Sequence, residues 1–314
     1  MVESNPKEAS TTVLRAVGVS RRFGEILALK DVSLSVARGQ LYGLVGPDGA
    51  GKTTLIRALS GLIGVEQGHV EVFGSNPLTH AALRERMGVM PQHYSLYGDL
   101  SVGENLRFFA DLYCLSRKVY EERVTRLLTL TQLLPFTERR ASALSGGMYK
   151  KLALACALLH EPKVLLLDEP TNGVDPVSRR ELWQLLHEFV ANEMAVFIST
   201  AYMDEAARCH EVCLLHQGEV IAQGPPRRLV SELDAKVLEV HGGAREHLDL
   251  VLEGAPGLIA MSPAGERIRV VVAASDVESF LKTLSQNDII AEFVTANFED
   301  LFLAKTRKTE VKHA

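Results

Sequence analysis

The chain has 314 residues, of which 46% are hydrophobic and 23% are charged, and its formal net charge is −5. At roughly 150 residues per domain, this length suggests about two domains. The composition excludes a wholly disordered or collagen-like chain, and the acidic balance argues against a protein that binds nucleic acid through its overall charge.

Three features bear on the location of the protein. The longest apolar run, residues 152–159, is much shorter than the roughly 20 residues that a membrane-spanning helix needs. Residues 1–10 are polar and lack the apolar segment of a signal peptide. The 4 cysteines do not form a disulfide framework in a chain of this length. The sequence therefore predicts a reduced, cytoplasmic protein with a disordered tail at residues 1–10.

The first part of the chain reads as strands followed by one helix. Apolar residues recur at strand-like intervals over residues 13–19 and 32–36. Residues 41–45 form a compact apolar run that stops at a turn, as in a buried parallel strand. Residues 53–62 then have helical spacing, with Leu55 and Leu59 on one side.

A long helical insertion is expected over residues 102–134, where apolar residues follow helical rather than strand periodicity. Strand-like runs return at residues 164–167 and 195–198, with a helical segment at 178–190 between them. Strands that alternate with helices predict an α/β fold with a parallel core sheet.

Gly224-Pro225-Pro226 interrupts the pattern, and we place the end of the first domain at residue 228. The remaining residues, 229–314, are expected to form a small α+β accessory domain. Its strands and helices occur in the order βαββαβ, which suggests a ferredoxin-like fold. The expected elements are residues 237–240, 245–252, 258–261, 268–272, 276–284 and 289–294.

The strongest motif is Gly46-Pro47-Asp48-Gly49-Ala50-Gly51-Lys52-Thr53-Thr54, which matches GxxxxGK[ST] between a strand and a helix. Glycines let backbone N–H groups surround phosphate oxygens, and the helix that follows directs its positive end at them. We expect the Lys52 ammonium to reach the β- and γ-phosphates and the Thr53 hydroxyl to bind Mg²⁺. A glycine-rich turn without a ligand is the alternative, which the complete motif in this context disfavours.

A second motif, residues 164–169, is an apolar strand that ends in two acids. Asp168 can deliver a carboxylate to the Mg²⁺ shell, and Glu169 can polarise the attacking water. A core strand with two solvated acids at its end is the alternative. Together with the glycine-rich loop, these acids indicate a P-loop NTPase.

Four further elements resemble ABC-type ATPases. Leu144-Ser145-Gly146-Gly147-Met148 is similar to the signature sequence of that family, and Asn172-Gly173-Val174-Asp175 is similar to its D-loop. Gln92 occupies the position of the Q-loop glutamine of the family. Phe23 occupies the position at which the family has an aromatic ring that stacks on adenine. These elements occur in the family order between about residues 12 and 228.

This resemblance implies an ABC ATPase domain over residues 11–228, with antiparallel N-terminal strands and a helical subdomain at about 93–160. It also implies a head-to-tail dimer, with a second copy or a homologous ATPase, that holds two ATP molecules. One subunit would contribute Lys52, Gln92 and Glu169 as catalytic residues and Thr53, Gln92 and Asp168 as Mg²⁺ ligands. The other subunit would cap the γ-phosphate of the same nucleotide through Ser145, Gly146 and Gly147. Asp175 of the D-loop is also expected to contact the nucleotide.

Met148 and the segment 297–303 resemble the daunorubicin-resistance-type branch of drug exporters, whose ATPase subunits pair with separately encoded permeases. The resemblance implies a transport motor that lies on the cytoplasmic face of the inner membrane through an integral-membrane permease and does not bind nucleic acid. Residues 93–97, with the aromatic residues Tyr94 and Tyr97, are the expected permease contact, although a simple surface loop is equally compatible with them.

Ala201 stands where the family pattern has its switch histidine, which contacts the γ-phosphate. This departure leaves ATP binding intact but argues for slow hydrolysis. Two alternatives therefore stay open: a regulatory nucleotide-binding subunit with little hydrolysis, and a soluble ABC protein that acts on nucleic acid or ribosomes. A single ATPase cassette, the absence of heptads and the acidic charge disfavour the second alternative.

Two groups of residues are interpreted as parts of the fold rather than as binding or catalytic sites. Cys209, His210, Cys213 and His216 have spacings that could suggest zinc, but the apolar residues among them favour a core strand. Lys150 and Lys151 are interpreted as a solvated helix face.

Overall fold

The computed structural model describes residues 12–93 and 96–313. The chain divides into two compact units, Met1–Tyr202 with Cys209–Val220, and Met203–Arg208 with Ile221–Ala314. The division at Val220 precedes the boundary expected at residue 228. The tail expected at residues 1–10 lies outside the described residues.

The first unit begins with an antiparallel sheet of β2 (Ile26–Ala37), β1 (Thr12–Phe23) and β4 (Gln67–Val72), in that order. In β2, buried Val32, Leu34 and Val36 alternate with exposed residues. This two-residue period is typical of a strand with one face on the core.

The core sheet has the order β5-β6-β7-β3-β8-β9, and its first five strands pair in parallel. The strands of the full sheet are β5 (Met87–Met90), β6 (Val164–Asp168), β7 (Ala195–Thr200), β3 (Leu41–Val45), β8 (Glu211–His216) and β9 (Glu219–Gly224). Every residue of β3, β6 and β7 is buried, as expected where both faces of a parallel sheet are covered. The predicted parallel α/β core is therefore confirmed, and its carboxyl edge gathers the ends of β3, β6 and β7.

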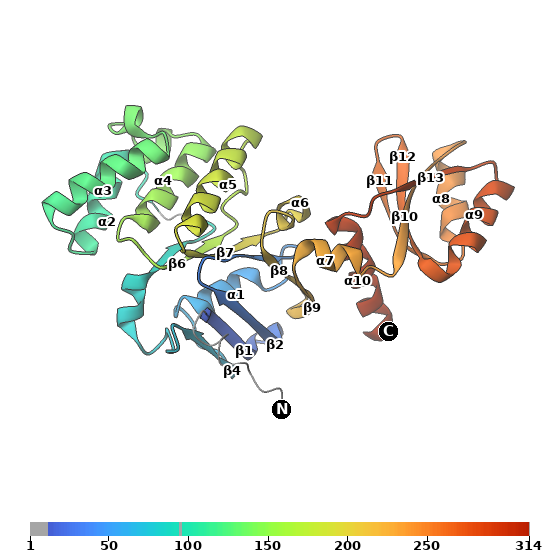
Figure 1. Cartoon of the computed structure of the whole chain (residues 1–314), viewed down its shortest axis with the longest axis horizontal. Coiled ribbons are helices and arrows are strands. Elements are labelled where there is room, and N and C mark those ends of the chain that lie inside the picture. The colour runs from blue at the N-terminus through green and yellow to red at the C-terminus, as the bar shows by residue number, and fades with distance from the viewer. Residues whose placement is uncertain (1–11, 94–95, 314) are drawn as a thin grey trace. The chain divides into compact units, whose positions relative to one another are not determined.

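Helices surround this sheet, and α2, α3 and α4 lie together as the predicted helical insertion (Figure 1). The α-helices of the unit are α1 (Lys52–Leu59), α2 (Val102–Leu112), α3 (Arg117–Leu130), α4 (Gly146–Leu158) and α5 (Pro176–Ala191). Short 3-10 turns are η1 (Ala81–Arg86), η2 (Leu134–Phe136) and η3 (Ala141–Ala143). Ser101 and Glu104 form a capping box at the start of α2, which explains why the helix begins there.

The second unit contains an antiparallel sheet of order β11-β12-β10-β13. Its strands are β10 (Ala235–His241), β11 (Leu258–Ala264), β12 (Arg267–Ala273) and β13 (Ile290–Val294). With α8 (Arg245–Glu253) and α9 (Val277–Gln286), they follow in the order βαββαβ, which is the order of a ferredoxin-like unit. The unit also contains α6 (Met203–Ala206), α7 (Pro226–Ser231), η4 (Ala274–Asp276) and α10 (Phe298–His313).

The two faces of this second sheet are covered by different helices. Leu252 of α8 and Phe280 of α9 pack with Leu238 and Val270 on one face. Ala304 of α10 packs with Val237 and Val271 on the other face. Both sides of the sheet thus have an apolar contact, which gives the unit its own core.

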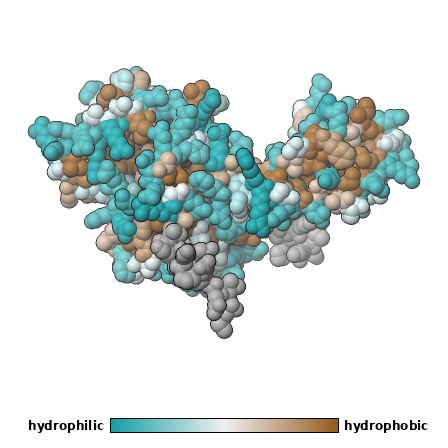
Figure 2. All heavy atoms as spheres, viewed as in Figure 1, coloured by the Kyte–Doolittle hydropathy of each residue, from teal (hydrophilic) through white to brown (hydrophobic). Residues whose placement is uncertain are grey.

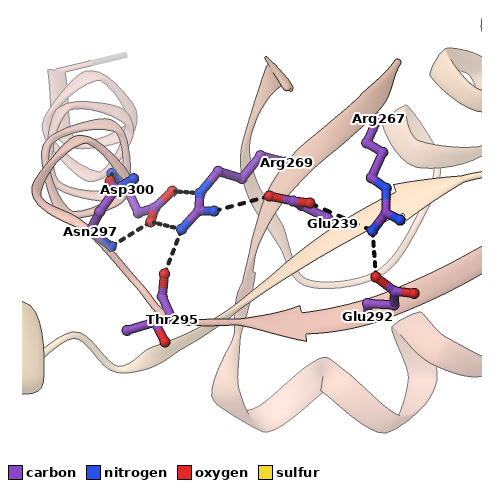
Figure 3. Close-up of polar contacts among 7 residues, drawn as sticks. All are labelled: Glu239, Arg267, Arg269, Glu292, Thr295, Asn297 and Asp300. Atoms are coloured by element: carbon purple, nitrogen blue, oxygen red, sulfur yellow. Dashed lines mark hydrogen bonds and ion pairs between the residues drawn. The ribbon is translucent and has the colours of Figure 1, made fainter. Parts of the chain in front are cut away.

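The start of α10 is fixed by a polar cluster (Figure 3). Asn297 and Asp300 cap each other, because the Asp300 N–H donates to Asn297 Oδ1 and the Asn297 N–H donates to Asp300 Oδ2. Arg269 of β12 donates to both oxygens of Asp300, at 2.9 and 2.8 Å, and to the Thr295 carbonyl. These contacts give a physical reason for the polar residues in the 297–303 segment.

The surface is mixed in character. Over the first unit, the face seen in Figure 2 is mainly hydrophilic, with hydrophobic side chains in small groups. Within the described part of the chain, none of the helices has the length and apolar character required to cross a bilayer.

Candidate active site

The glycine-rich loop lies between β3 and α1 and borders an open cavity of about 640 Å³. Glycine is required at two points of this loop. A Cβ on Gly46 would lie 2.2 Å from the Leu215 carbonyl oxygen, and one on Gly51 would lie 2.4 Å from the Ala28 carbonyl oxygen. Gly51 also has φ +107°, which side chains rarely tolerate. The cavity is lined by Ile26, Leu27, Ala28, Lys30, Asp48, Gly49, Gly51, Lys52, Thr53, Thr54, Gln92, Glu169 and Gln217.

Lys52 is only 4% exposed, so its ammonium group needs acceptors. It donates to the carbonyl oxygens of Gly46 and Pro47, at 2.8 and 3.0 Å. Its Nζ also lies 3.0 Å from Glu169 Oε1. The loop thus holds a buried positive charge at the wall of the cavity.

Glu169 is 5% exposed, and both of its carboxylate oxygens have partners. Oε1 faces Lys52, while Oε2 accepts from Gln92 Nε2 at 2.7 Å and from Asn172 Nδ2 at 3.2 Å. The residue has φ +48°, a conformation uncommon for a side chain of this kind. Backbone strain of this sort concentrates at functional sites.

Asp168 ends β6 and is buried beside β7. The Ser199 hydroxyl donates to Asp168 Oδ1 at 2.6 Å and accepts from the Glu169 N–H at 2.9 Å. Asp168 and Ser199 are paired in the parallel ladder, so one hydroxyl orients both acidic residues. Of the expected Mg²⁺ ligands, Thr53 and Gln92 line the cavity, whereas Asp168 is not among its lining residues.

The remaining expected nucleotide contacts lie elsewhere in the unit. Ser145 caps α4 by accepting from the Met148 N–H, and Asp175 caps α5 by accepting from the N–H groups of Val177 and Ser178. Gly147 lies so close to α5 that a Cβ would be 2.3 Å from Ser178 Oγ. Among the described residues, Ser145, Gly146, Gly147 and Asp175 are not part of the cavity lining, and neither is Phe23.

Comparison with known proteins agrees with this geometry. The family described as "ABC transporter" matches residues 29–172. A Nod factor export ATP-binding protein I of Ralstonia nicotianae is 36% identical over 311 residues, which cover 96% of each chain. This chain belongs to the family of ABC transporter ATP-binding proteins. A probable multidrug ABC transporter ATP-binding protein, YbhF of Escherichia coli, is 40% identical over 93% of the present chain, which spans about half (51%) of that relative.

Solved structures of ABC transporter subunits have the same fold as the first unit. An ATP-binding subunit of an ABC transporter is 30% identical, with a TM-score of 0.64 over 70% of this chain and 93% of that one. The cbiO1 protein of Clostridium perfringens, part of an ABC transporter complex, is 28% identical with a TM-score of 0.64 over 71% and 92% of the two chains. The predicted P-loop ATPase fold of the ABC type is therefore confirmed.

Ala201 directly follows β7 in this ABC cassette. The Thr200 carbonyl oxygen accepts from the Gly46 N–H at 3.2 Å, which ties the end of β7 to the loop. The neighbouring Tyr202 ring lies under the Arg179 guanidinium, 4.2 Å from its centroid. The methyl group of Ala201 supplies no hydrogen-bond donor at this position.

Phe23 is 46% exposed, and the Arg21 guanidinium lies 4.9 Å from its ring centroid. Phe23 does not line the cavity, whereas residues 26–28 of β2, which follow it closely in the sequence, do. The adenine contact of Phe23 therefore stays a prediction.

The contacts that Ser199, Asn172 and Lys150 make in the site were not predicted from the sequence. Lys150 Nζ donates to the Gln92 carbonyl oxygen at 2.9 Å. Burial lowers the pKa of Lys150, whereas the nearby charges of Asp168 and Glu169 act in the opposite direction. The interpretation of Lys150 and Lys151 as a solvated face is wrong, because Lys150 is half-buried and Lys151 is buried in an ion pair with Glu181.

The cysteines and histidines of this pattern lie in β8 or directly before it. Cys213 is buried in β8, and the side chain of Cys209 lies close to Gly43 of β3. His210 Nδ1 accepts from the Leu41 N–H at 3.0 Å. Over residues 12–93 and 96–313, no three or more His, Cys, Asp or Glu side chains are grouped to hold a metal ion.

Proposed function

We propose that this protein binds and hydrolyses ATP as the motor subunit of an ABC exporter and drives a separately encoded permease. The observation that carries the proposal is the buried contact between Lys52 and Glu169 at the wall of the glycine-rich cavity. A cation that recognises phosphate and a carboxylate that can accept a proton from water lie together there.

The residues of the site suggest how the reaction proceeds. The Lys52 ammonium and the loop N–H groups bind the phosphates of ATP, so phosphate oxygens take over the role of Glu169 as the anionic partner. The carboxylate released from Lys52 is then available to polarise water. Gln92 and Asn172, which both donate to Oε2, keep that carboxylate oriented.

A magnesium ion fits the donor set of this site. The Thr53 hydroxyl, the Asp168 carboxylate and the Gln92 side-chain oxygen are the hard oxygen ligands that Mg²⁺ prefers. When bound, Mg²⁺ neutralises negative charge on the phosphates. Ser199 orients the Asp168 carboxylate by donating to Oδ1.

A closed dimer would complete the site. Ser145, Gly146, Gly147 and Asp175 are at the N-terminal ends of α4 and α5, away from the cavity lining of their own chain. Helix N-termini favour anions. This position supports a role for these residues at the nucleotide of a second copy or a homologous ATPase.

A permease contact is supported by a groove of about 330 Å³ between α1, β5, α2 and α4. Leu62 and Phe109 line it, and Leu62 is 65% exposed. Tyr97, 52% exposed, packs edge-on against Phe108, with 4.7 Å between ring centroids. Exposed aromatic residues are typical of protein interfaces. Tyr94 lies outside the described residues.

We infer that the permease holds the protein at the cytoplasmic face of the inner membrane. We also assign the protein to the daunorubicin-resistance-type branch of drug exporters. Drug export is supported by the similarity to the Escherichia coli relative, a probable multidrug ABC transporter ATP-binding protein. Ala201 favours slow hydrolysis and also keeps open a second function, a regulatory subunit that responds to ATP binding alone.

Affinity purification from detergent-solubilised membranes, followed by phosphate-release assays, tests the proposal. We expect a multi-span membrane protein to co-purify and the complex to release phosphate from ATP. ATP binding without phosphate release would support the regulatory function instead. Recovery with RNA or ribosomes and without a membrane protein would contradict the exporter function.

A further inference from the structure

We propose that Lys150 is a positioning residue that holds Gln92 against Glu169 and so links the catalytic carboxylate to helix α4. The catalytic part of this inference rests on the proposed ATP hydrolysis. The contact itself does not.

Gln92 is held from two sides. Its backbone carbonyl oxygen accepts from Lys150 Nζ at 2.9 Å, and its side-chain Nε2 donates to Glu169 Oε2 at 2.7 Å. Lys150 belongs to α4, whereas Gln92 follows β5 and Glu169 follows β6. One residue therefore connects a helix of the insertion to the acid at the edge of the core sheet.

A second contact from α4 reaches Leu96. The Leu96 N–H donates to the Tyr149 hydroxyl at 3.2 Å. Tyr149 and Lys150, consecutive residues of α4, thus contact Leu96 and Gln92.

The charge of Lys150 suits this role. The side chain is half-buried and lies in the field of Asp168 and Glu169. A hydrogen bond from an ammonium group to a carbonyl is stronger than one between neutral groups. A side chain of similar length without the charge would fill the space but release the Gln92 carbonyl.

The neighbouring lysine has a different partner and offers a matched control. Lys151 is paired with Glu181 of α5, so its contact holds two helices together rather than the Gln92 loop. Ser145 caps the same helix that carries Lys150.

The experiment compares Lys150→Met, Lys150→Arg and Lys151→Met in the full chain. We expect Lys150→Met to lower kcat for ATP by about 10- to 100-fold, because a misplaced catalytic group costs rate rather than ground-state binding. The ATP Kd should stay within about threefold of the parent value, and Lys150→Arg should restore most of kcat. Lys151→Met should lower the Tm with kcat kept near the parent value.

Hydrogen exchange of the peptide that covers β5 and the following residues separates this inference from the proposed function. Lys150→Met should speed exchange there, whereas Lys151→Met should not. If the parent releases no phosphate, the proposed hydrolysis is wrong. Hydrogen exchange alone then tests whether Lys150 holds Gln92. Unchanged exchange in Lys150→Met overturns the inference, as does an unchanged kcat in an active protein.

Discussion

Lys52 and Glu169 form an ion pair, 3.0 Å between Nζ and Oε1, in which both side chains are almost fully buried. Removing two charges from water costs free energy, and such a pair is maintained only with further hydrogen bonds. Here the carbonyl oxygens of Gly46 and Pro47 surround the ammonium, and two side-chain amides surround the carboxylate. The two groups that we propose for phosphate binding and water activation are therefore in direct contact.

Lys52→Ala should abolish tight ATP binding, because the buried cation of the loop is lost. It also leaves Glu169 buried without its charged partner, so the variant should be less stable than the parent. Equilibrium binding of a fluorescent ATP analogue, well below the unfolding temperature, measures the first effect. Lys163→Ala, at an exposed lysine, is the control. An ATP affinity of Lys52→Ala within a few-fold of the parent would remove Lys52 from the proposed site.

Glu169→Gln should keep the shape of the side chain while removing its charge and basicity. The amide cannot accept a proton from water, so the ATP-bound dimer should accumulate. Gel filtration with Mg-ATP, in the presence of the permease, detects this species. A variant that stays monomeric under these conditions argues against a closed dimer.

Ala201→His should raise turnover while the ATP Kd changes little. A preorganised donor aimed at developing charge is typically worth about 10²–10³ in rate. Steady-state phosphate release measures the effect, and Ala201→Phe controls for bulk because its ring has no donor. If parent turnover is already fast and the histidine adds nothing, another residue performs this role.

Asp300→Ala should destabilise the second unit. Asp300 is buried, accepts twice from Arg269 and caps α10, so the change leaves a guanidinium with its main partner gone, at a cost of about 3 kcal/mol. Differential scanning calorimetry should show the transition of this unit shifted downward. Glu292→Ala breaks the exposed pair with Arg267 shown in Figure 3 and should leave that transition almost unchanged. Equal shifts in the two variants would contradict the account of the cluster.

Prediction from sequence succeeded where the signal is local. The Gly46 to Thr54 motif is contiguous, and the apolar runs of β3, β6 and β7 have turn residues at their ends. A local pattern is enough to predict such elements, because loop geometry and strand burial depend on neighbouring residues. The order βαββαβ in the second unit was visible for the same reason.

Prediction failed where the contact depends on how strands and helices pack. Ser199 donates to Asp168 only because β6 and β7 are adjacent and in register. The residues around position 199 in the sequence do not indicate an acidic partner. A pair of lysines on a helix is typical of a solvated face, yet the packing of α4 directs Lys150 toward Gln92. Asn172 was noted within the D-loop motif, but its contact with Glu169 requires the folded turn.

The most direct test of the proposed function measures ATP binding and phosphate release on the same samples of the parent and Glu169→Gln. We expect both proteins to bind ATP with similar affinity, the parent to release phosphate at a slow but measurable rate, and Glu169→Gln to release almost none. Phosphate release by Glu169→Gln at the parent rate would contradict the central claim, that Glu169 activates water for hydrolysis at this site.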